Sequence, residues 1–409
     1  MNRFRHLGAT FLLAGTFLPA AVLAEGVTHV DLSPDERPSL NSVEGGHVLS
    51  NPWWQNFEIH GFGSAGYYDT GENGTVPNGS FSIKEASIFV HADVWQDVEM
   101  FIEVQTNRLG KDDSLFTRTG EVHVHFRNLR ISDSFKLGLK VGRFDIPFGE
   151  EYLSQDSIDN PLITTSASYV YGWDEGILGY ADIGGVGVIA AISDGTDARS
   201  EEDDNSKAFN LKVYGDVTEK LYLSFSAMHN GDAAKSAVEF GGSHFEPTGA
   251  SHVSTLGVSS SEKVNGSLVQ LDGKYDLFGH LGYLSAYIGY AEQHDDDTVF
   301  ERDFRWFGVE LYREISANWY LVTRYSEIGT YDSDEGYHFD GKIYAGGNGS
   351  FGYDTKRFRR LGVGLGFMPN PRVLVKFELG RDWFDLIDAS TLGGTSGREF
   401  AAAELAVGF

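Results

Sequence analysis

The chain contains no cysteine and little proline or methionine, with 10 and 4 residues respectively among 409. Disulfide bridges are therefore excluded. Beyond residue 24, no stretch offers the run of about 18 uncharged apolar residues that a membrane-spanning helix needs. Basic residues are also scarce, at 32 Lys and Arg against 59 Asp and Glu, and the formal net charge of −27 argues against a nucleic-acid partner. Glycine (50 residues) and aromatic residues (13%) are abundant, which favours β-structure.

The first 24 residues have the pattern of a secretory signal peptide. Arg3 and Arg5 precede an apolar stretch, residues 9–19, and small residues end at Ala24. The apolar stretch is too short for a spanning helix, so a cleaved signal is preferred to an N-terminal anchor. Cleavage after Ala24 removes two positive charges, which takes the formal net charge from −27 to −29.

The next segment, residues 25–56, contains Pro34, Pro38 and Pro52 and shows no sustained period. We expect an irregular periplasmic extension there. From Phe57 the sequence changes to alternating segments of about ten residues, the length that a tilted strand needs to cross a membrane. Sixteen such segments are predicted, near 57–68, 80–94, 97–108, 119–131, 135–145, 173–182, 185–193, 206–216, 220–229, 265–276, 280–292, 302–313, 318–328, 357–368, 371–383 and 398–409.

The connections between these segments alternate in length. Very short ones, such as Gln96-Asp97 and Pro369-Asn370, alternate with long ones, such as 146–172 and 230–264. An even number of strands with short turns at one end and long loops at the other is typical of a bacterial outer-membrane barrel. A soluble sandwich has no reason to sort its loops in this way.

The two faces of the predicted strands differ in polarity. In the last segment, Leu405, Val407 and Phe409 share one side, whereas Glu404 lies on the other. Periodicity alone leaves open which face meets lipid, because a soluble barrel would place its apolar face inside. The signal peptide, the loop sorting and the terminal Val407-Gly408-Phe409, which resembles the C-terminal signature of outer-membrane proteins, favour lipid outside. The fold class is therefore predicted as all-β, a 16-stranded antiparallel transmembrane β-barrel over residues 57–409.

The stretch Val141-Gly142-Arg143-Phe144, followed by Pro147-Phe148-Gly149, resembles the phosphate-selective porin O and P family. Elsewhere the resemblance is architectural and extends over roughly residues 57–409. The resemblance implies a trimeric sixteen-stranded channel whose third long loop folds into the lumen. Residues 145–172 here suit that role, since they are too numerous for a turn and too apolar for a solvated linker.

The expected constriction loop departs from the family in its charge. It has no Lys or Arg between residues 145 and 172, whereas phosphate selection calls for a basic constriction. Its acidic candidates for the constriction are Asp145, Glu150, Glu151, Asp156 and Asp159. Phosphate specificity therefore does not follow from the resemblance.

Basic residues on the barrel wall provide the counterpart to this acidic loop. Strand parity places five of them on the lumen side, namely Arg127, Lys136, Lys140, Arg360 and Lys376. A basic wall facing an acidic loop predicts a transverse field suited to zwitterions and small polar solutes. Arg143 shares parity with the apolar Val141, so it lies either at the rim or turned inward at the strand end.

Other patterns have simpler interpretations. Glu121, His123 and His125 share one strand face and could hold a metal, but they are better explained as polar lining, and no metal or cofactor is expected. The acidic tract 201–204 could bind divalent cations that bridge lipopolysaccharide, although a solvated loop is preferred. Gly362, Gly364 and Gly366 alternate within a strand, so we interpret them as wall positions that leave room for the inserted loop.

The sequence therefore predicts an outer-membrane porin of a Gram-negative cell, a passive diffusion channel for small hydrophilic solutes and ions. No enzymatic activity is expected, because the histidines lack a recognisable nucleophile spacing. The expected partners are outer-membrane lipid and lipopolysaccharide, the permeating solutes and two further copies in a homotrimer. Two alternatives remain: an anion-selective channel for phosphate or carboxylates, and a surface-structural or adhesive barrel. A long internal constriction favours a channel over a platform.

Overall fold

The computed structural model describes residues 56–69, 78–108, 115–132, 135–154, 156–195, 206–233, 239–241, 264–279, 281–295, 302–330, 337–339, 353–386 and 397–409. The expected signal peptide 1–24 and nearly all of the expected extension 25–56 lie outside the described residues, as does the acidic tract 201–204. In the described ranges, no helix has the length and apolar character needed to cross a membrane.

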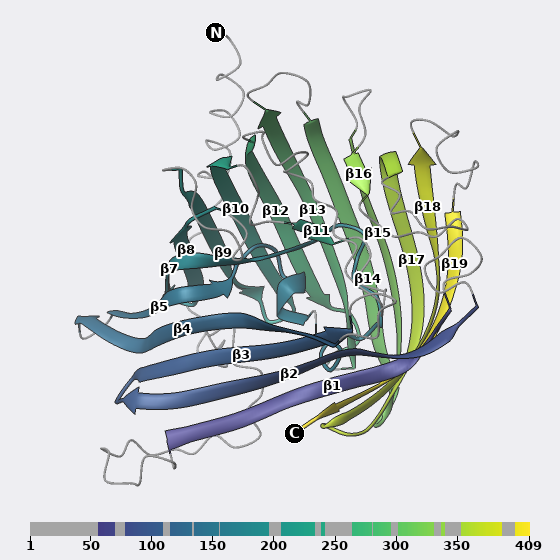
Figure 1. The fold of residues 1–409 in the computed structure, drawn as a ribbon, viewed down its shortest axis with the longest axis horizontal. Helices are drawn as coiled ribbons and strands as arrows, with labels where there is room; N and C mark the ends of the chain where they lie inside the picture. The colour runs from purple at the N-terminus through teal and green to yellow at the C-terminus, as the bar shows by residue number, and fades with distance from the viewer. Residues whose placement is uncertain are drawn as a thin grey trace. The chain divides into compact units, whose positions relative to one another are not determined.

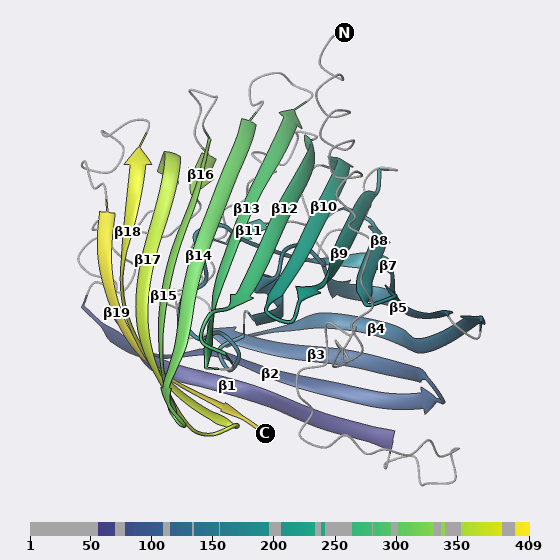
Figure 2. The same ribbon diagram turned by 180° about the vertical axis from the view of Figure 1, so that it is seen from behind.

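Sixteen long strands form a closed antiparallel barrel, in which each strand pairs with its neighbours along the chain. The ring closes where β1 pairs with β19, with Phe62 opposite Gly408 and Asp69 opposite Ala401 (Figure 1, and Figure 2 from behind). The strands are β1 (Phe57–Asp69), β2 (Ser80–Trp95), β3 (Val98–Arg108), β4 (Leu115–Ser132), β5 (Phe135–Asp145), β7 (Trp173–Ile183), β8 (Val186–Ser193), β9 (Ala208–Thr218), β10 (Leu221–Ala233), β12 (Val264–Asp276), β13 (Gly282–Asp295), β14 (Arg302–Ser316), β15 (Trp319–Thr330), β17 (Tyr353–Asn370), β18 (Val373–Leu386) and β19 (Gly397–Gly408).

Three short strands and one helical turn belong to the connections. In the long segment between β5 and β7 lie a 3-10 turn, η2 (Glu151–Ser154), and β6 (Tyr169–Tyr171). β6 pairs with β11 (Glu239–Gly241), which lies between β10 and β12. β16 (Tyr337–Phe339) extends the wall beside β17.

The predicted fold class and strand number are confirmed, with differences at strand ends. β4 and β17 each begin four residues before their predicted starts, at Leu115 and Tyr353. Both extensions lie on the side of the long connections, where the apolar alternation used for the prediction fades. The turn between β7 and β8 is Gly184-Gly185, whereas the predicted segments 173–182 and 185–193 placed it one residue earlier, at Ile183-Gly184. The φ angles of 65° and 85° suit a tight hairpin of two glycines.

The outer surface of the barrel is apolar and the inner surface is polar. Val141, Ile177 and Leu405 point outward and are between 40% and 47% exposed. On alternate positions, Lys376 and Glu404 point inward and are no more than 2% exposed. This is the reverse of a soluble barrel, and it matches a chain that meets lipid outside and polar groups inside.

Glycines on the inner wall make room for aromatic rings. At six positions a glycine and an aromatic residue are direct partners on adjacent strands, and a Cβ on the glycine would stand within 2.3 Å of the ring. Each ring covers the bare backbone opposite it, which accounts for the glycine at these six positions. The pairs are Gly138 with Tyr180, Gly187 with Tyr214, Gly289 with Trp306, Gly308 with Tyr287, Gly366 with Tyr320, and Gly380 with Phe400.

Candidate functional site: the inserted loop and the passage beside it

The segment between β5 and β7, residues 146–172, folds into the barrel. It leaves the wall at Ile146, whose amide donates to the carbonyl of Gly172 at 2.9 Å and so closes the base of the loop. Three residues later Gly149 has a φ of +69°, and a Cβ there would lie 2.5 Å from the side-chain Nε2 of Gln270. The left-handed backbone conformation favours glycine at this position. The Pro147-Phe148-Gly149 motif is therefore the point where the chain turns inward.

Apolar side chains of the loop pack against the inner wall. Ile146, Phe148, Ala167 and Val170 belong to a buried cluster with residues from β9, β10, β12, β13, β14, β15, β17 and β18. Leu162, which is 1% exposed, lies against Gly362 and Gly364 of β17, where a Cβ would stand 3.3 and 2.5 Å from its methyl groups. The prediction that these glycines leave room for the loop is confirmed at those two positions, whereas Gly366 faces the ring of Tyr320.

Cationic side chains of the wall bind the backbone of the loop. Lys376 of β18 donates to the carbonyl oxygens of Ser157, Asn160 and Leu162 at 2.7, 3.2 and 3.0 Å. Its charge is balanced by Glu404 of β19, 2.8 Å away. Carbonyl oxygens bound by a buried ammonium are held more strongly than by a neutral donor.

Three more wall cations hold the next residues of the loop. Each donates to a single backbone carbonyl: Lys84 to Ile163 at 2.8 Å, Arg324 to Thr164 at 3.0 Å and Arg360 to Thr165 at 3.2 Å. Residues 163–165 are thus fixed from the adjacent strands β15 and β17 and from β2, which pairs with neither of them.

An acidic wall residue binds the loop from its donor side. Glu378 of β18 accepts hydrogen bonds from the amides of Ile163 and Thr164, at 2.7 and 2.9 Å, and from the Thr164 hydroxyl at 2.6 Å. The wall therefore satisfies both the donors and the acceptors of this buried backbone, as a chain segment that leaves the sheet requires.

The acidic side chains at the start of the loop are paired with other wall residues. Glu150 lies 2.9 Å from Lys212 of β9 and accepts from the Tyr222 hydroxyl at 2.9 Å. Glu151 accepts from the Ser166 hydroxyl and lies 3.4 Å from Arg324. Near the end of the loop, burial and the neighbouring Asp145 and Glu151 raise the pKa of the Tyr169 phenol well above its ordinary value, so it stays protonated.

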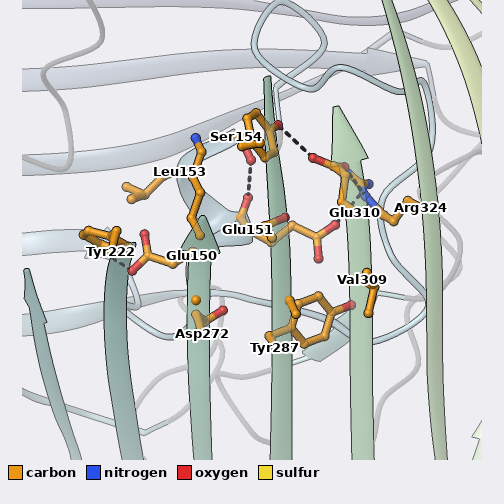
Figure 3. A pocket seen from close by; sticks show the side chains of 15 residues that line it. Glu150, Glu151, Leu153, Ser154, Tyr222, Asp272, Tyr287, Val309, Glu310 and Arg324 are labelled. Carbon is orange, nitrogen blue, oxygen red and sulfur yellow. Dashed lines mark hydrogen bonds and ion pairs between the residues drawn. The ribbon is translucent and has the colours of Figure 1, made fainter. Parts of the chain in front are cut away.

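A cavity of about 270 Å³ lies between the start of the loop and the wall (Figure 3), and we refer to it as the passage. Figure 3 shows Glu150, Glu151 and Ser154 on the loop side, with side chains of β10 to β15 around them. Four carboxylates and two cations line it, together with Ser154, Tyr222, Tyr283, Tyr287 and parts of the wall backbone. The charged residues are Glu150, Glu151, Asp272, Glu310, Lys274 and Arg324.

The five acidic residues expected at the constriction are not all brought together. Glu150 and Glu151 line the passage. Asp156 is buried at 6% exposure, Asp159 is exposed, and the amide of Asp145 binds the side chain of Glu121 at 2.8 Å.

The basic residues expected on the lumen wall also divide. Arg360 and Lys376 contact the loop directly, as described above. Lys140 points inward and is 1% exposed, and Arg127 forms ion pairs with Asp93 and Glu99 at 2.5 and 3.2 Å. Lys136 lies in β5, but its side chain is outside the described set.

Arg143 and the histidine motif have clear positions. Arg143 lies on the outer face and pairs with Glu175 of β7 at 2.7 Å, so it does not turn inward. His125 contacts the Tyr180 hydroxyl at 2.7 Å, and His123 contacts the backbone carbonyl of Arg143 at 3.2 Å. Within the described residues, no three His, Asp or Glu side chains are grouped so as to hold a metal ion.

Sequence reasoning missed most of the residues that surround the passage. Asp272 and Glu310 line it, and each is an inward residue next to an outward apolar one, such as Val309 and Leu311 around Glu310. Lys212, which pairs with Glu150, has the same pattern. Strand parity could therefore have predicted that these side chains point inward. The distance between the loop and a given strand could not be predicted from the sequence, because it depends on how the ring closes.

No family model and no curated protein matches the chain. Solved structures that resemble it include the outer-membrane channel DcaP of Acinetobacter baumannii, with 12% identity over 86% of this chain and 97% of that one and a TM-score of 0.57. In-vitro folded OmpT of Vibrio cholerae matches at 11% identity over 86% and 97%, with a TM-score of 0.54. An anion-selective porin from Comamonas acidovorans matches at 10% identity over 86% and 99%, with a TM-score of 0.53. At such identities these similarities establish the fold alone, a closed antiparallel β-barrel like those of the matched proteins.

Proposed function

We propose that the protein is an outer-membrane porin, a passive diffusion channel for small hydrophilic solutes and ions. The observation that carries this proposal is the combination of an apolar outer wall with a polar interior narrowed by an anchored loop. A barrel that served only as a surface platform has no need for the interior hydrogen bonds that hold residues 157–165 across the lumen. The solved barrels of similar fold are outer-membrane proteins, and this agrees with the proposal.

Several finer features belong to the same proposal. Residues 1–24 serve as the export signal, residues 25–56 as a periplasmic extension and residues 57–409 as the barrel, which lies in outer-membrane lipid and lipopolysaccharide. The Pro147-Phe148-Gly149 turn supports membership of the phosphate-selective porin O and P family. A homotrimer is proposed on the same resemblance, and the Vibrio cholerae OmpT barrel of similar fold has a trimer form.

The charge of the passage favours cations over anions. Four carboxylates face two cations there, and the wall cations outside it are engaged with loop carbonyls and carboxylates. The anion-selective channel is kept as the second candidate, because the Comamonas acidovorans porin of similar fold is anion-selective. The acidic lining of this chain is the observation that sets the two apart.

Purified protein inserted into a planar lipid bilayer tests the channel directly. We expect stepwise increases of conductance, each step corresponding to one channel unit. Folded protein that inserts into the bilayer without conducting would contradict the proposal and leave the structural or adhesive barrel as the better description. Unheated gel mobility at monomer size in mild detergent would contradict the trimer.

A further inference from the structure

Two opposite charges in the passage lack an ionic partner. Three of its four carboxylates are compensated: Glu150 by Lys212, and Glu151 and Glu310 by Arg324, whose guanidinium lies 2.6 Å from Glu310. Asp272 and Lys274 of β12 form no ion pair with any residue in the described part of the chain. These two side chains set the passage apart from a generally polar surface.

Asp272 is a buried carboxylate with an unused oxygen. It is 5% exposed, and Gln270 donates to its Oδ1 at 2.8 Å. The Oδ2 atom is buried and accepts no hydrogen bond from the described residues. Burial and the nearby Glu150 carboxylate oppose the charge of Asp272; Gln270, the ammonium of Lys212 and the amide of Glu150 favour it, but Lys212 is already paired with Glu150. A buried carboxylate oxygen without a donor is costly, so a cationic donor from outside the chain would be bound favourably.

Lys274 lies on the same face of the same strand. Residues two apart on a strand point to the same side, and their Cα atoms are on the order of 7 Å apart. The Lys274 ammonium lies 4.0 Å from the centroid of the Tyr283 ring. The carboxylates of Glu310 and Glu150 act on its charge without forming an ion pair with it in the described part of the chain. Both residues line the passage, and Figure 3 shows Asp272 facing the space between the loop and the wall.

We propose that this part of the passage is a subsite for small zwitterions, with the ammonium group of the solute on Asp272 and its carboxylate on Lys274. A solute that carries both charges satisfies both side chains at once, whereas an inorganic ion satisfies one. A passage of about 270 Å³ admits a molecule of a few heavy atoms with part of its water. The subsite rests on the proposed channel, since only a channel would bring solutes to it.

The subsite would act as a stepping point during diffusion. Binding must be weak enough for the solute to leave, so the expected effect is a concentration-dependent block of the ion current. β-Alanine is the probe, because its ammonium and carboxylate are joined by a two-carbon chain. Propylammonium and propionate are matched analogues of similar size that each lack one of the two charges.

Current through single channels in a planar bilayer is measured with each probe added in turn. We expect β-alanine to block at lower concentration than either analogue. Asp272→Asn and Lys274→Gln should each raise the half-blocking concentration of β-alanine about tenfold, the effect of losing one charge-assisted hydrogen bond. Asp272→Glu should retain most of the wild-type block by β-alanine, because this substitution keeps the carboxylate.

Glu99→Gln is the matched control, since Glu99 is a buried carboxylate of β3 that pairs with His91 and Arg127 outside the passage. It should leave the β-alanine block unchanged. Equal block by β-alanine and propylammonium would overturn the role of Lys274. An Asp272→Asn channel that conducts and is blocked as before would overturn the subsite, which is the result expected if the Asp272 carboxyl simply carries a proton. Absence of any conductance would count against the channel itself, so the two failures are distinguishable.

Discussion

Lys376 of β18 donates to the backbone carbonyl of Ser157, 2.7 Å away, and thereby joins the wall of the barrel to the loop inside it. The same ammonium binds two further loop carbonyls and Glu404. This one cation therefore holds three backbone carbonyls between residues 157 and 162 against β18.

Replacing Lys376 by Met should loosen the loop and destabilise the barrel. Among the described residues, Glu404 would keep Lys84, at 3.6 Å, and the Tyr68 hydroxyl, at 3.0 Å. Breaking a buried pair in this way costs roughly 3 kcal/mol of unfolding free energy. The midpoint of heat-induced change in gel mobility should fall, and the single-channel current should become larger and noisier.

Arg381→Met provides the control for that experiment. Arg381 lies on the same strand but on the outer face, with a side chain 52% exposed and a single ion pair to Glu399. Its loss should change unfolding by no more than about 0.5 kcal/mol and leave the current unchanged. A Lys376→Met channel with wild-type conductance and noise would contradict the anchoring role.

Gly364→Ala tests the packing of the loop tip. The new Cβ would stand 2.5 Å from a methyl group of Leu162 and 3.1 Å from Val322, so Leu162 must move. Overpacking of this kind costs about 1–3 kcal/mol. In a Leu162→Ala background the same substitution should cost much less, and this coupling is measured as a double-mutant cycle by thermal unfolding. Gly179→Ala, whose Cβ would meet only contacts of 3.7 Å or more, should be silent. Equal costs of Gly364→Ala in both backgrounds would show that Leu162 does not occupy this space.

Much of the fold follows from the sequence because lipid and water impose a two-residue period on every strand. Wherever an apolar residue such as Val141 alternates with an inward one such as Lys140, the strand and its facing can be read directly. The prediction weakens where the strands extend beyond the residues that alternate in this way, as in the first residues of β4 and β17. The pairing of β6 with β11 joins two loops far apart in the sequence, and local pattern holds no signal for it.

The site could be predicted less well than the fold. Strand parity predicted that Arg360 and Lys376 point inward. The length and apolar content of residues 146–172 indicated an inserted loop. The expected transverse field assumed that the wall cations face open solvent across from the loop acids. Instead, Arg360 is held by Asp382 at 2.8 Å and by a loop carbonyl. Whether a side chain faces water or another segment depends on tertiary contact, which strand parity does not contain.

Cysteine labelling tests the orientation of the barrel. Both termini are expected on the periplasmic side, with the long connection 230–264 at the cell surface. The short turn after β17, predicted at Pro369-Asn370 and found two residues later at Pro371-Arg372, is expected in the periplasm. The chain has no native cysteine, so single substitutions at these places can be labelled without background. In intact cells a membrane-impermeant maleimide should label the former and not the latter. Labelling of both would exclude the proposed topology.

Ion selectivity is the remaining prediction, and the charges of the passage determine its sign. Four carboxylates and two cations line it, so we expect a weak cation preference in reversal potentials measured across a planar bilayer under a salt gradient. The preference should fade as salt rises, because the Debye length is about 8 Å at physiological ionic strength and shortens further above it.

Substitutions in the passage should shift this selectivity. Lys274→Gln should increase the cation preference and Asp272→Asn should decrease it. Neither side chain has an ion-pair partner in the described chain, so neither substitution leaves another charge unpaired. Neutralising Lys136, Lys140 and Arg360 should also shift selectivity toward cations, although Arg360 holds the loop as well and its loss should alter the current itself. Strong anion selectivity, or block of the current by phosphate at low concentration, would contradict the acidic passage and favour the phosphate channel.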